Sequence, residues 1–269
     1  MRVLILGDME GVAGICRWEH VLAEKALYEE GRRLYTGELN AAVRGAKQAG
    51  ATDITVVDTH GAGGARSFNS VVREELDSGC RYCTQHRWLD FESLLKQGYQ
   101  AAAIVGMHAM AGTPDGVLAH TASYDTWMGA TVNWTPIGET AILAALCGHY
   151  ACPTVFVSGD EATCREAEGL LGGKVVTAAV KRGLNKFGAL HLTPQDSCDL
   201  IQARVAEALG KVGTIPIYSP PEPCTVQIQF TSPEIVSYYE RIPGVERAGN
   251  CGIEISSESW YTVWKLLFG

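Results

Sequence analysis

Short apolar runs alternate with longer amphipathic stretches along most of this chain. The apolar runs cover residues 3–6, 53–57, 101–105 and 154–157, and polar or glycine residues follow each of them. Short runs without polar positions are typical of strands buried on both faces of a parallel sheet, and the amphipathic stretches between them are typical of covering helices. The pattern therefore predicts an α/β fold, with a mostly parallel sheet flanked by helices.

The helices of this fold are expected at four places. Helical spacing of apolar residues covers about 21–50, 138–149 and 161–171, and Thr193 followed by Pro194 is typical of a helix start. The β-branched and aromatic residues of 131–136 predict a further strand, inserted between these units.

The C-terminal end of the chain follows a different pattern. Residues 218–223 are rich in proline and without periodicity, which indicates a linker. Beyond it, 225–230 alternates with period two, and a helix from Glu234, an extended stretch near Ile253 and a last helix from Glu258 follow. We expect an α/β body over residues 1–218 and a smaller α+β part over residues 224–269, which can pack with the body as one unit.

Composition excludes several classes of protein. The 269 residues carry a formal net charge of −8, without a cluster of Lys or Arg, so neither a nucleic acid nor an anionic membrane surface is an expected partner. No apolar run approaches the roughly 20 residues that span a bilayer. The nine cysteines are odd in number and dispersed, which favours reduced thiols and a cytoplasmic protein.

Candidate chemistry follows the first three predicted strands. Asp8 and Glu10 come after the first strand, Asp58 and His60 after the second, and His108 after the third. The carboxyl ends of neighbouring parallel strands open onto one crevice, and Asp8 and Glu10 point to the same side of an extended backbone. Carboxylates and imidazoles that converge in this way predict a metal site, with Zn²⁺ as the leading candidate.

Simpler explanations exist for each residue taken alone. An Asp or His after a strand is most often a turn residue or a helix cap. Three consecutive strands that end in metal-ligand residue types outweigh that explanation. A nucleotide-binding loop at 7–14 is a weak alternative, because the glycine spacing differs from G-x-G-x-x-G and two acids would repel a pyrophosphate.

The chain resembles the D-aminopeptidases of peptidase family M55. Five segments match that family's motifs in order, and the similarity covers nearly the whole chain, more loosely after residue 220. The matching segments are Gly7-Asp8-Met9-Glu10-Gly11, Asp58-Thr59-His60, Gly106-Met107-His108, the stretch from Thr113 to His120, and Ile137-Gly138-Glu139.

This resemblance implies a centre of two Zn²⁺ ions per chain. Asp8 corresponds to the carboxylate that bridges both metals, and the other implied ligands are Glu10, His60, His108 and Glu139. His120 corresponds to the catalytic histidine, which we expect to donate a proton to the oxyanion or the leaving nitrogen. Only the resemblance identifies Glu139, since an acid at a helix start usually complements the helix dipole.

The implied activity is that of a zinc-dependent aminopeptidase. It would hydrolyse the N-terminal residue of short peptides or amides, with D-amino acids as the expected type, through a metal-bridging hydroxide. Members of the family form large ring-shaped homo-oligomers, so a homo-oligomer such as a decamer is also implied.

The chain departs from the family pattern at two places, and both concern the substrate. Asp115 adds a residue between His108 and His120, and the bulky stretch around Trp127 leads towards Glu139. Another dinuclear-metal amide hydrolase, acting on an L-peptide or a non-peptide amide, therefore remains an alternative, as does a metal-binding module without catalysis. Asp58 could orient an imidazole or cap a turn.

Overall fold

The computed structural model describes residues 1–268 and contains two sheets. The larger has seven strands in the order β3-β2-β1-β4-β7-β8-β9, and all neighbours are parallel except β8 and β9. This confirms the expected mostly parallel α/β sheet. Its strands are β1 (Arg2–Gly7), β2 (Asp53–Asp58), β3 (Arg81–Cys83), β4 (Ala101–Met107), β7 (Thr154–Asp160), β8 (Val176–Asn185) and β9 (Gly188–His191).

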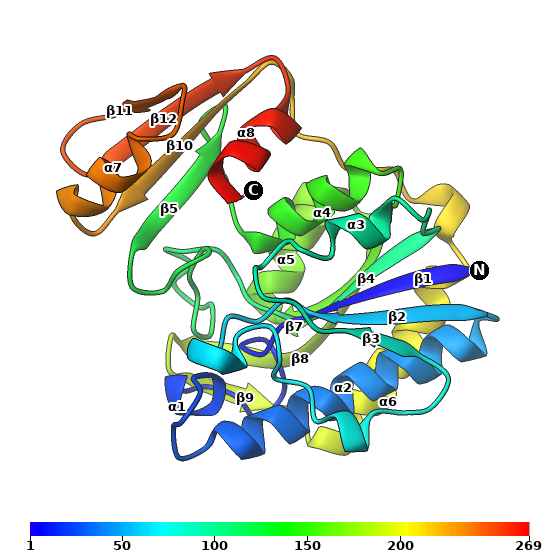
Figure 1. Ribbon diagram of the computed structural model, residues 1–269. Coiled ribbons are helices and arrows are strands. Elements are labelled where there is room, and N and C mark those ends of the chain that lie inside the picture. The colour runs from blue at the N-terminus through cyan, green and yellow to red at the C-terminus, as the bar shows by residue number, and fades with distance from the viewer. Residues whose placement is uncertain (269) are drawn as a thin grey trace.

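Helices cover both faces of this sheet (Figure 1). In β1, Val3 and Ile5 join the core under α2 and α6, whereas Leu4 and Leu6 join the core under α4 and α5. An unbroken apolar run is required here because alternate side chains enter two different cores. The helices of this half are α1 (Trp18–Val21), α2 (Tyr28–Gln48), α3 (Glu92–Leu95), α4 (Glu139–His149), α5 (Glu161–Leu171) and α6 (Pro194–Leu209).

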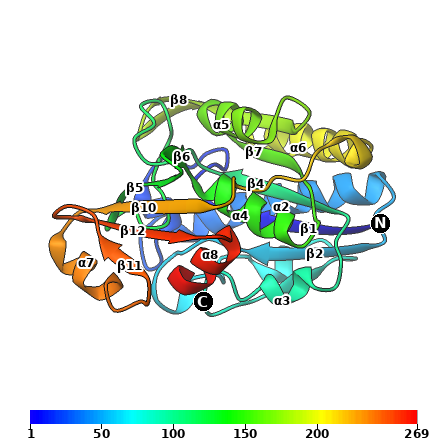
Figure 2. The same cartoon turned by 90° about the horizontal axis from the view of Figure 1, so that it is seen from above.

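The second sheet is antiparallel and lies to one side of the first, beyond α4 (Figures 1 and 2). Its strand order is β11-β12-β10-β5-β6, and its inner face shares a continuous core with α4 and α8. Its elements are β5 (Trp127–Val132), β6 (Thr135–Ile137), β10 (Cys224–Phe230), α7 (Pro233–Tyr239), β11 (Val245–Arg247), β12 (Gly252–Ser257) and α8 (Trp260–Phe268).

The strand expected at 131–136 is a hairpin of the second sheet, not an insertion in the first. β5 pairs with β10, which lies almost a hundred residues later in the chain. The turn between β5 and β6 places Asn133 and Trp134 at positive φ, as a two-residue hairpin turn requires. A boundary between residues 218 and 224 therefore leaves two strands of the second sheet on the N-terminal side.

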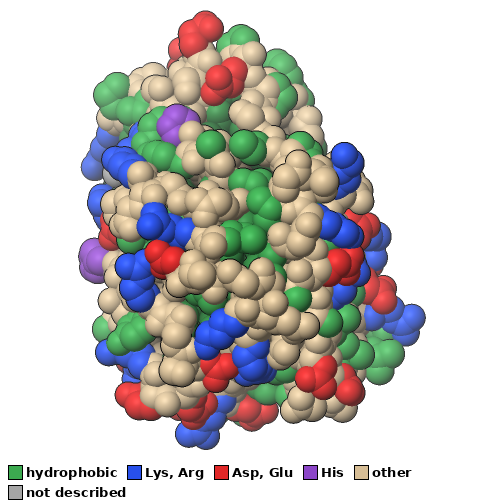
Figure 3. All heavy atoms as spheres, turned by 90° about the vertical axis from the view of Figure 1, so that its right-hand side faces the viewer, with side chains coloured by type: hydrophobic (Ala, Val, Ile, Leu, Met, Phe, Trp, Pro, Cys, Tyr) green, Lys and Arg blue, Asp and Glu red, His purple; other side chains and the backbone are tan. Residues whose placement is uncertain are grey.

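Other differences from the expected elements are local. The helix expected over 21–50 begins only at Tyr28, as α2, and the short helix α1 ends at Val21, where the longer helix was expected to begin. Within the described residues, every helix is too short or too polar to cross a bilayer. On the face drawn in Figure 3, Lys and Arg side chains lie among Asp and Glu side chains.

Candidate metal centre

The candidate site lies where the strand order of the large sheet reverses direction. From β1 the chain proceeds to β2 on one side, and later to β4 on the other side. Gly7 at the end of β1 pairs with Asp58 at the end of β2 and with Val105 of β4, which continues to Met107, so the ends of the three strands lie close together. A crevice at the carboxyl ends of strands at such a switch point is the usual ligand site of this sheet type.

Two glycines allow the segment after β1 to lie directly on the end of β4. The Gly11 N–H donates a hydrogen bond to the Gly106 carbonyl at 2.8 Å. A Cβ atom on Gly11 would lie 1.9 Å from the Met107 carbonyl oxygen, and one on Gly106 would lie 2.2 Å from that of Asp8. Any larger residue would move Asp8 and Glu10 away from the end of β4.

Asp8 lies at the centre of the cluster and connects its two halves. Its Oδ1 is 3.0 Å from Nδ1 of His60, and its Oδ2 is 3.4 Å from Nε2 of His108. Glu10 Oε2 is 3.1 Å from the same nitrogen of His60. On the other side, Glu139 Oε1 is 3.3 Å from His108 Nε2 and 3.7 Å from His120 Nε2.

All three imidazoles are held in the same manner. One ring nitrogen of each donates to a backbone carbonyl: His60 Nε2 to Val21 at 2.8 Å, His108 Nδ1 to Ala109 at 3.0 Å, and His120 Nδ1 to Leu118 at 2.9 Å. Because a carbonyl only accepts, these bonds leave the other nitrogen of each ring facing the carboxylates. Histidines that bind metals are oriented in this way by their second nitrogen.

Burial and mutual charge shift the pKa values of the acidic groups. Burial, reinforced by Glu10, raises the pKa of Asp8 to about 7. Burial acts to raise the pKa of Glu10, but the charge of the nearby His60 ring holds it well below its usual range. The pKa of Glu139 is lowered, because His108 outweighs the effect of burial.

The imidazoles shift in opposite directions. For His108, the charge of Glu139 overcomes the effect of burial and raises the pKa to about 10. For His120, burial and the neighbouring His108 ring lower the pKa to about 4. The two rings are stacked with centroids 4.0 Å apart.

These residues fit a metal centre. Three carboxylates and three imidazoles are buried together, and such a concentration of charge is costly unless a cation or proton is shared. Within residues 1–268, Glu10 Oε2 and His108 Nε2 are buried without a hydrogen-bond partner. Single ligand atoms of Asp8, Glu10 and His108, and again of His108, His120 and Glu139, lie within 4.8 Å of one another. The donor set of imidazole nitrogens and carboxylate oxygens suits zinc.

Buried polar groups from distant elements hold the loop after β1. Lys181 of β8 donates from Nζ to the carbonyls of Glu10, Val12 and Ile15, at 2.5, 2.9 and 2.7 Å. Burial lowers the pKa of Lys181 to about 8. The sequence signal for this contact is a lysine within an apolar strand, and Lys181 is not among the residues that we predicted to be functional.

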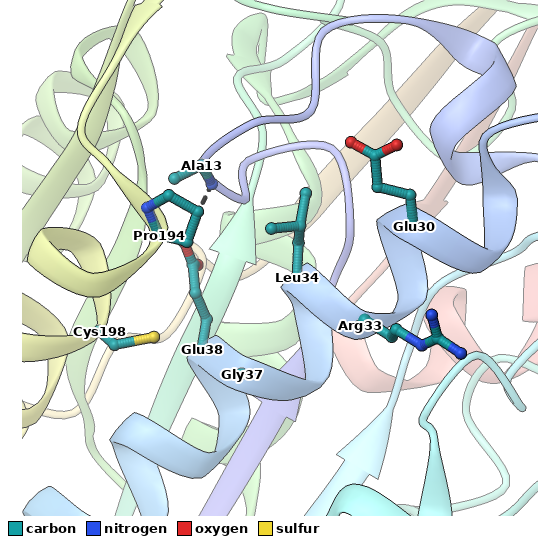
Figure 4. Close-up of a pocket in the computed structure, with 8 residues that line it drawn as sticks. All are labelled: Ala13, Glu30, Arg33, Leu34, Gly37, Glu38, Pro194 and Cys198. Carbon is teal, nitrogen blue, oxygen red and sulfur yellow. Dashed lines mark hydrogen bonds between the residues drawn. The ribbon is translucent and has the colours of Figure 1, made fainter.

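The far side of this loop is fixed from α2. Glu38 accepts hydrogen bonds from the Ala13 N–H at 2.9 Å and from the Ser197 hydroxyl at 2.6 Å. Figure 4 shows Glu38 reaching Ala13 beneath Pro194, in a hollow of about 450 Å³ that lies outside the cluster. His191 Nδ1 accepts from the Gly14 N–H at 3.0 Å.

Hydrogen bonds from distant elements also hold the loop that carries His120. Asp160 at the end of β7 accepts from the Val117 N–H at 2.7 Å, and the Lys186 carbonyl accepts from the Leu118 N–H at 2.8 Å. Leu118 and Ala122 adopt positive φ angles of 52° and 59° on either side of His120. Strained conformations of this kind persist only where surrounding contacts impose them, and they concentrate at functional sites.

The remaining candidates differ in position. The Asp58 carboxylate accepts hydrogen bonds from the backbone N–H groups of His60 and Ser70 and from the Tyr35 hydroxyl, so it shapes the turn that carries His60. Asp115 forms an exposed ion pair with Arg165 and does not line the site.

Trp127, the tryptophan that the sequence singled out, and the nearby Trp134 are in different places. Trp127 lines the cavity of the cluster and is 7% exposed. Trp134 lies at the turn between β5 and β6, is 71% exposed and lines a separate hollow.

A cavity of about 300 Å³ opens directly onto the cluster. The cluster forms one wall, and residues from both halves of the molecule complete it. Four aromatic residues that line the cavity were not predicted from the sequence: Phe68, Trp88, Tyr239 and Phe268.

Comparison with known proteins agrees with this geometry. The family model of the M55 peptidases, described as D-aminopeptidase, matches residues 1–268. A D-aminopeptidase of Bacillus subtilis (strain 168) is 26% identical over 269 residues, which cover 99% of this chain and 95% of that protein. A solved structure, described as "Zn-dependent D-aminopeptidase DppA from Bacillus subtilis, a self-compartmentalizing protease", superposes with a TM-score of 0.89 at 26% identity, again over 99% and 95% of the two chains.

Proposed function

Since this chain belongs to the M55 peptidase family of D-aminopeptidases, we propose that it is a zinc-dependent aminopeptidase whose substrates are short peptides or amides with an N-terminal D-residue. The observation that carries this proposal is the buried cluster in which Asp8 connects two groups of ligands. Comparing the hydrolysis rates of D- and L-residue amides tests the proposed preference for D-residues.

Five residues of the chain would hold two zinc ions. Asp8 lies between the two halves; Glu10 and His60 belong to one half, and His108 and Glu139 to the other. When bound, zinc supplies Lewis acidity and makes a water-derived nucleophile available at neutral pH. The backbone carbonyls that hold the imidazoles fix which nitrogen each ring presents.

His120 is placed to move a proton during the reaction. Its Nδ1 donates to the Leu118 carbonyl, so in the neutral ring Nε2 carries the lone pair and faces Glu139. Nε2 therefore accepts the proton released by the attacking water and then donates it to the leaving nitrogen. His120 would then act first as the proton acceptor and then as the proton donor. From the sequence we expected only the donor role. The nearby Trp18 ring, at 5.6 Å, packs edge-on against the imidazole and restricts its orientation.

The chain also has a surface suited to self-association. β9 is an edge strand, and the β8–β9 hairpin exposes large apolar side chains, including Leu184, Phe187 and Leu190. Exposed apolar groups on an unpaired edge favour pairing with another chain. We expect a homo-oligomer in solution, and light scattering of the purified protein measures its size; a ring such as a decamer is the finer expectation.

The test of function measures release of ammonia from D-alanine and L-alanine amides. We expect cleavage of the D-amide, its loss after chelation and its recovery with added zinc. Preference for the L-amide would show that the substrates are L-peptides, and the proposed metal site would be unaffected by that result. Cleavage that persists at full rate after complete removal of metal would contradict the proposal.

A further inference from the structure

Two kinds of side chain line the cavity over the metal centre. The ends of the large sheet contribute the carboxylates and imidazoles of the cluster. A second group is aromatic, and we call it the aromatic wall: Phe68, Trp88, Trp127, Tyr239 and Phe268. No Lys or Arg lines the cavity in the part of the chain that the structure describes.

Four of the five rings of the aromatic wall belong to one packed network, and Phe68 is held separately. The Phe268 ring packs edge-on against Trp88, with centroids 5.6 Å apart, and lies 5.7 Å from Trp127. Trp127 in turn contacts Phe230, which stacks on Tyr239 at 4.9 Å. Phe230 is 1% exposed, so the wall is supported from behind by the core of the second sheet. Rings packed in this way keep their orientation without a ligand.

Several of these rings retain exposed surface that faces the cavity. Phe68, Trp88, Tyr239 and Phe268 are each half-buried, and each lines the cavity. Phe68 also has a φ angle of 60°, and its N–H donates to the His60 carbonyl at 2.8 Å. A bulky residue in this conformation is rare, which indicates that neighbouring contacts hold the ring at the cavity.

From this juxtaposition we propose that the aromatic wall receives the side chain of the substrate's N-terminal residue, and that the enzyme prefers large apolar or aromatic N-terminal residues to alanine. The proposal rests on the proposed aminopeptidase function. The scissile bond must lie at the metal cluster, and the cavity of about 300 Å³ is at the small end of ligand pockets. The residue nearest the cluster, which is the one released, therefore occupies it.

The experiment compares kcat/KM for the amides of alanine, leucine and phenylalanine, in both the D and L series, with the zinc-loaded enzyme. Amides are suitable because the released residue is their only amino acid. We expect the phenylalanine amide of the accepted series to exceed the alanine amide by roughly 10- to 200-fold, the range that an apolar pocket usually achieves.

A variant connects this preference to the aromatic wall. Phe268 is the last described residue of α8, so Phe268→Ala removes one ring without entering the core of a sheet. We expect the phenylalanine-to-alanine ratio to fall at least about tenfold and Phe268→Leu to restore much of it. Leu266→Ala is the matched control, because Leu266 is on the same helix, 38% exposed, and does not line the cavity.

The possible results separate the two proposals. If alanine amides are cleaved as well as phenylalanine amides, or if Phe268→Ala leaves the ratio unchanged, the inference on specificity is wrong and the aminopeptidase function stands. If no amide of either series is cleaved by the zinc-loaded enzyme, both proposals are contradicted. A folded state of Phe268→Ala is verified by a melting temperature close to that of Leu266→Ala.

Discussion

The cavity combines side chains from two regions that are built on different principles. The large sheet places charged groups at the ends of β1, β2 and β4, where parallel register brings them close together. The second sheet contributes apolar rings from β5, α7 and α8, segments far apart in the chain. The groups expected to catalyse hydrolysis and most of the rings expected to select the substrate therefore belong to separate structural units. Changes in the first region should abolish catalysis, whereas changes in the second should alter preference or stability.

Loss of the central carboxylate should have the largest effect. In Asp8→Ala, both halves of the cluster lose a shared ligand, and we expect zinc binding to fail and kcat/KM to fall on the order of 10⁴-fold or more, because several kcal/mol of charge stabilisation disappear. Metal analysis and amide hydrolysis measure the two effects. Asp199→Ala, an exposed acid on α6, is the control. An Asp8→Ala enzyme with full zinc content would contradict the assigned position of Asp8.

Removing His120 should separate proton transfer from metal binding. His120→Ala should reduce kcat by about 10²- to 10⁴-fold, the usual contribution of a general acid–base group, while zinc content stays unchanged. His86→Ala serves as control because His86 is exposed and does not line the cavity. A large loss of zinc in His120→Ala would instead identify this histidine as a ligand.

A smaller effect is expected at Lys181, which positions the ligand loop without lining the cavity. Lys181→Met leaves three buried carbonyls without their donor, so we expect unfolding free energy to fall by about 3 kcal/mol or more. Zinc affinity should weaken by about 10- to 100-fold, as for other groups that orient ligands. Denaturant titration and zinc titration measure these values. As a control, Lys174→Met replaces an exposed lysine and should change neither the unfolding free energy nor the zinc affinity. An unchanged zinc affinity in Lys181→Met would show that the ligand loop keeps its shape without Lys181.

The smallest predicted effect concerns the contact between the two regions. Glu92 of α3 accepts hydrogen bonds from Tyr150 and Tyr261 and pairs with Lys265 at 3.0 Å, so it connects α4 and α8. Burial opposes ionisation, but these donors lower the pKa of Glu92 to about 2. A depressed carboxyl pKa stabilises the fold above the ordinary value near 4.5, and this stabilisation is lost as the pH falls towards about 2.

Glu92→Gln tests this contact. We expect it to reduce unfolding free energy by about 1–2 kcal/mol near neutral pH, after allowance for solvent screening, with the difference from wild type shrinking below about pH 4.5. Urea unfolding at several pH values measures it. A constant difference down to the most acidic pH at which the protein stays folded would show that the carboxylate charge contributes nothing.

The sequence predicts the first region better than the second. Buried strands of a parallel sheet are unbroken apolar runs, and the residues that follow them share one edge, so Asp8, Glu10, His60 and His108 could be proposed together. Glu139 required the family resemblance, since its position at a helix start is common for structural reasons.

The aromatic wall had no comparable local signal. Alternation predicts a strand but not its partner, so β5 could not be assigned to β10. Phe268 and Tyr239 reach the cavity only through the packing of the second sheet against α4 and α8. Similarly, the role of Lys181 depends on a loop some 170 residues away in the chain, at the Glu10 carbonyl.

The proposed function depends on one cluster of this chain, which we propose binds two catalytic zinc ions around Asp8. The most direct measurement titrates metal-free protein with zinc while following amide hydrolysis and bound metal. We expect activity to rise to its plateau at two zinc ions per chain. A plateau at one ion per chain, or full activity before zinc is added, would contradict it.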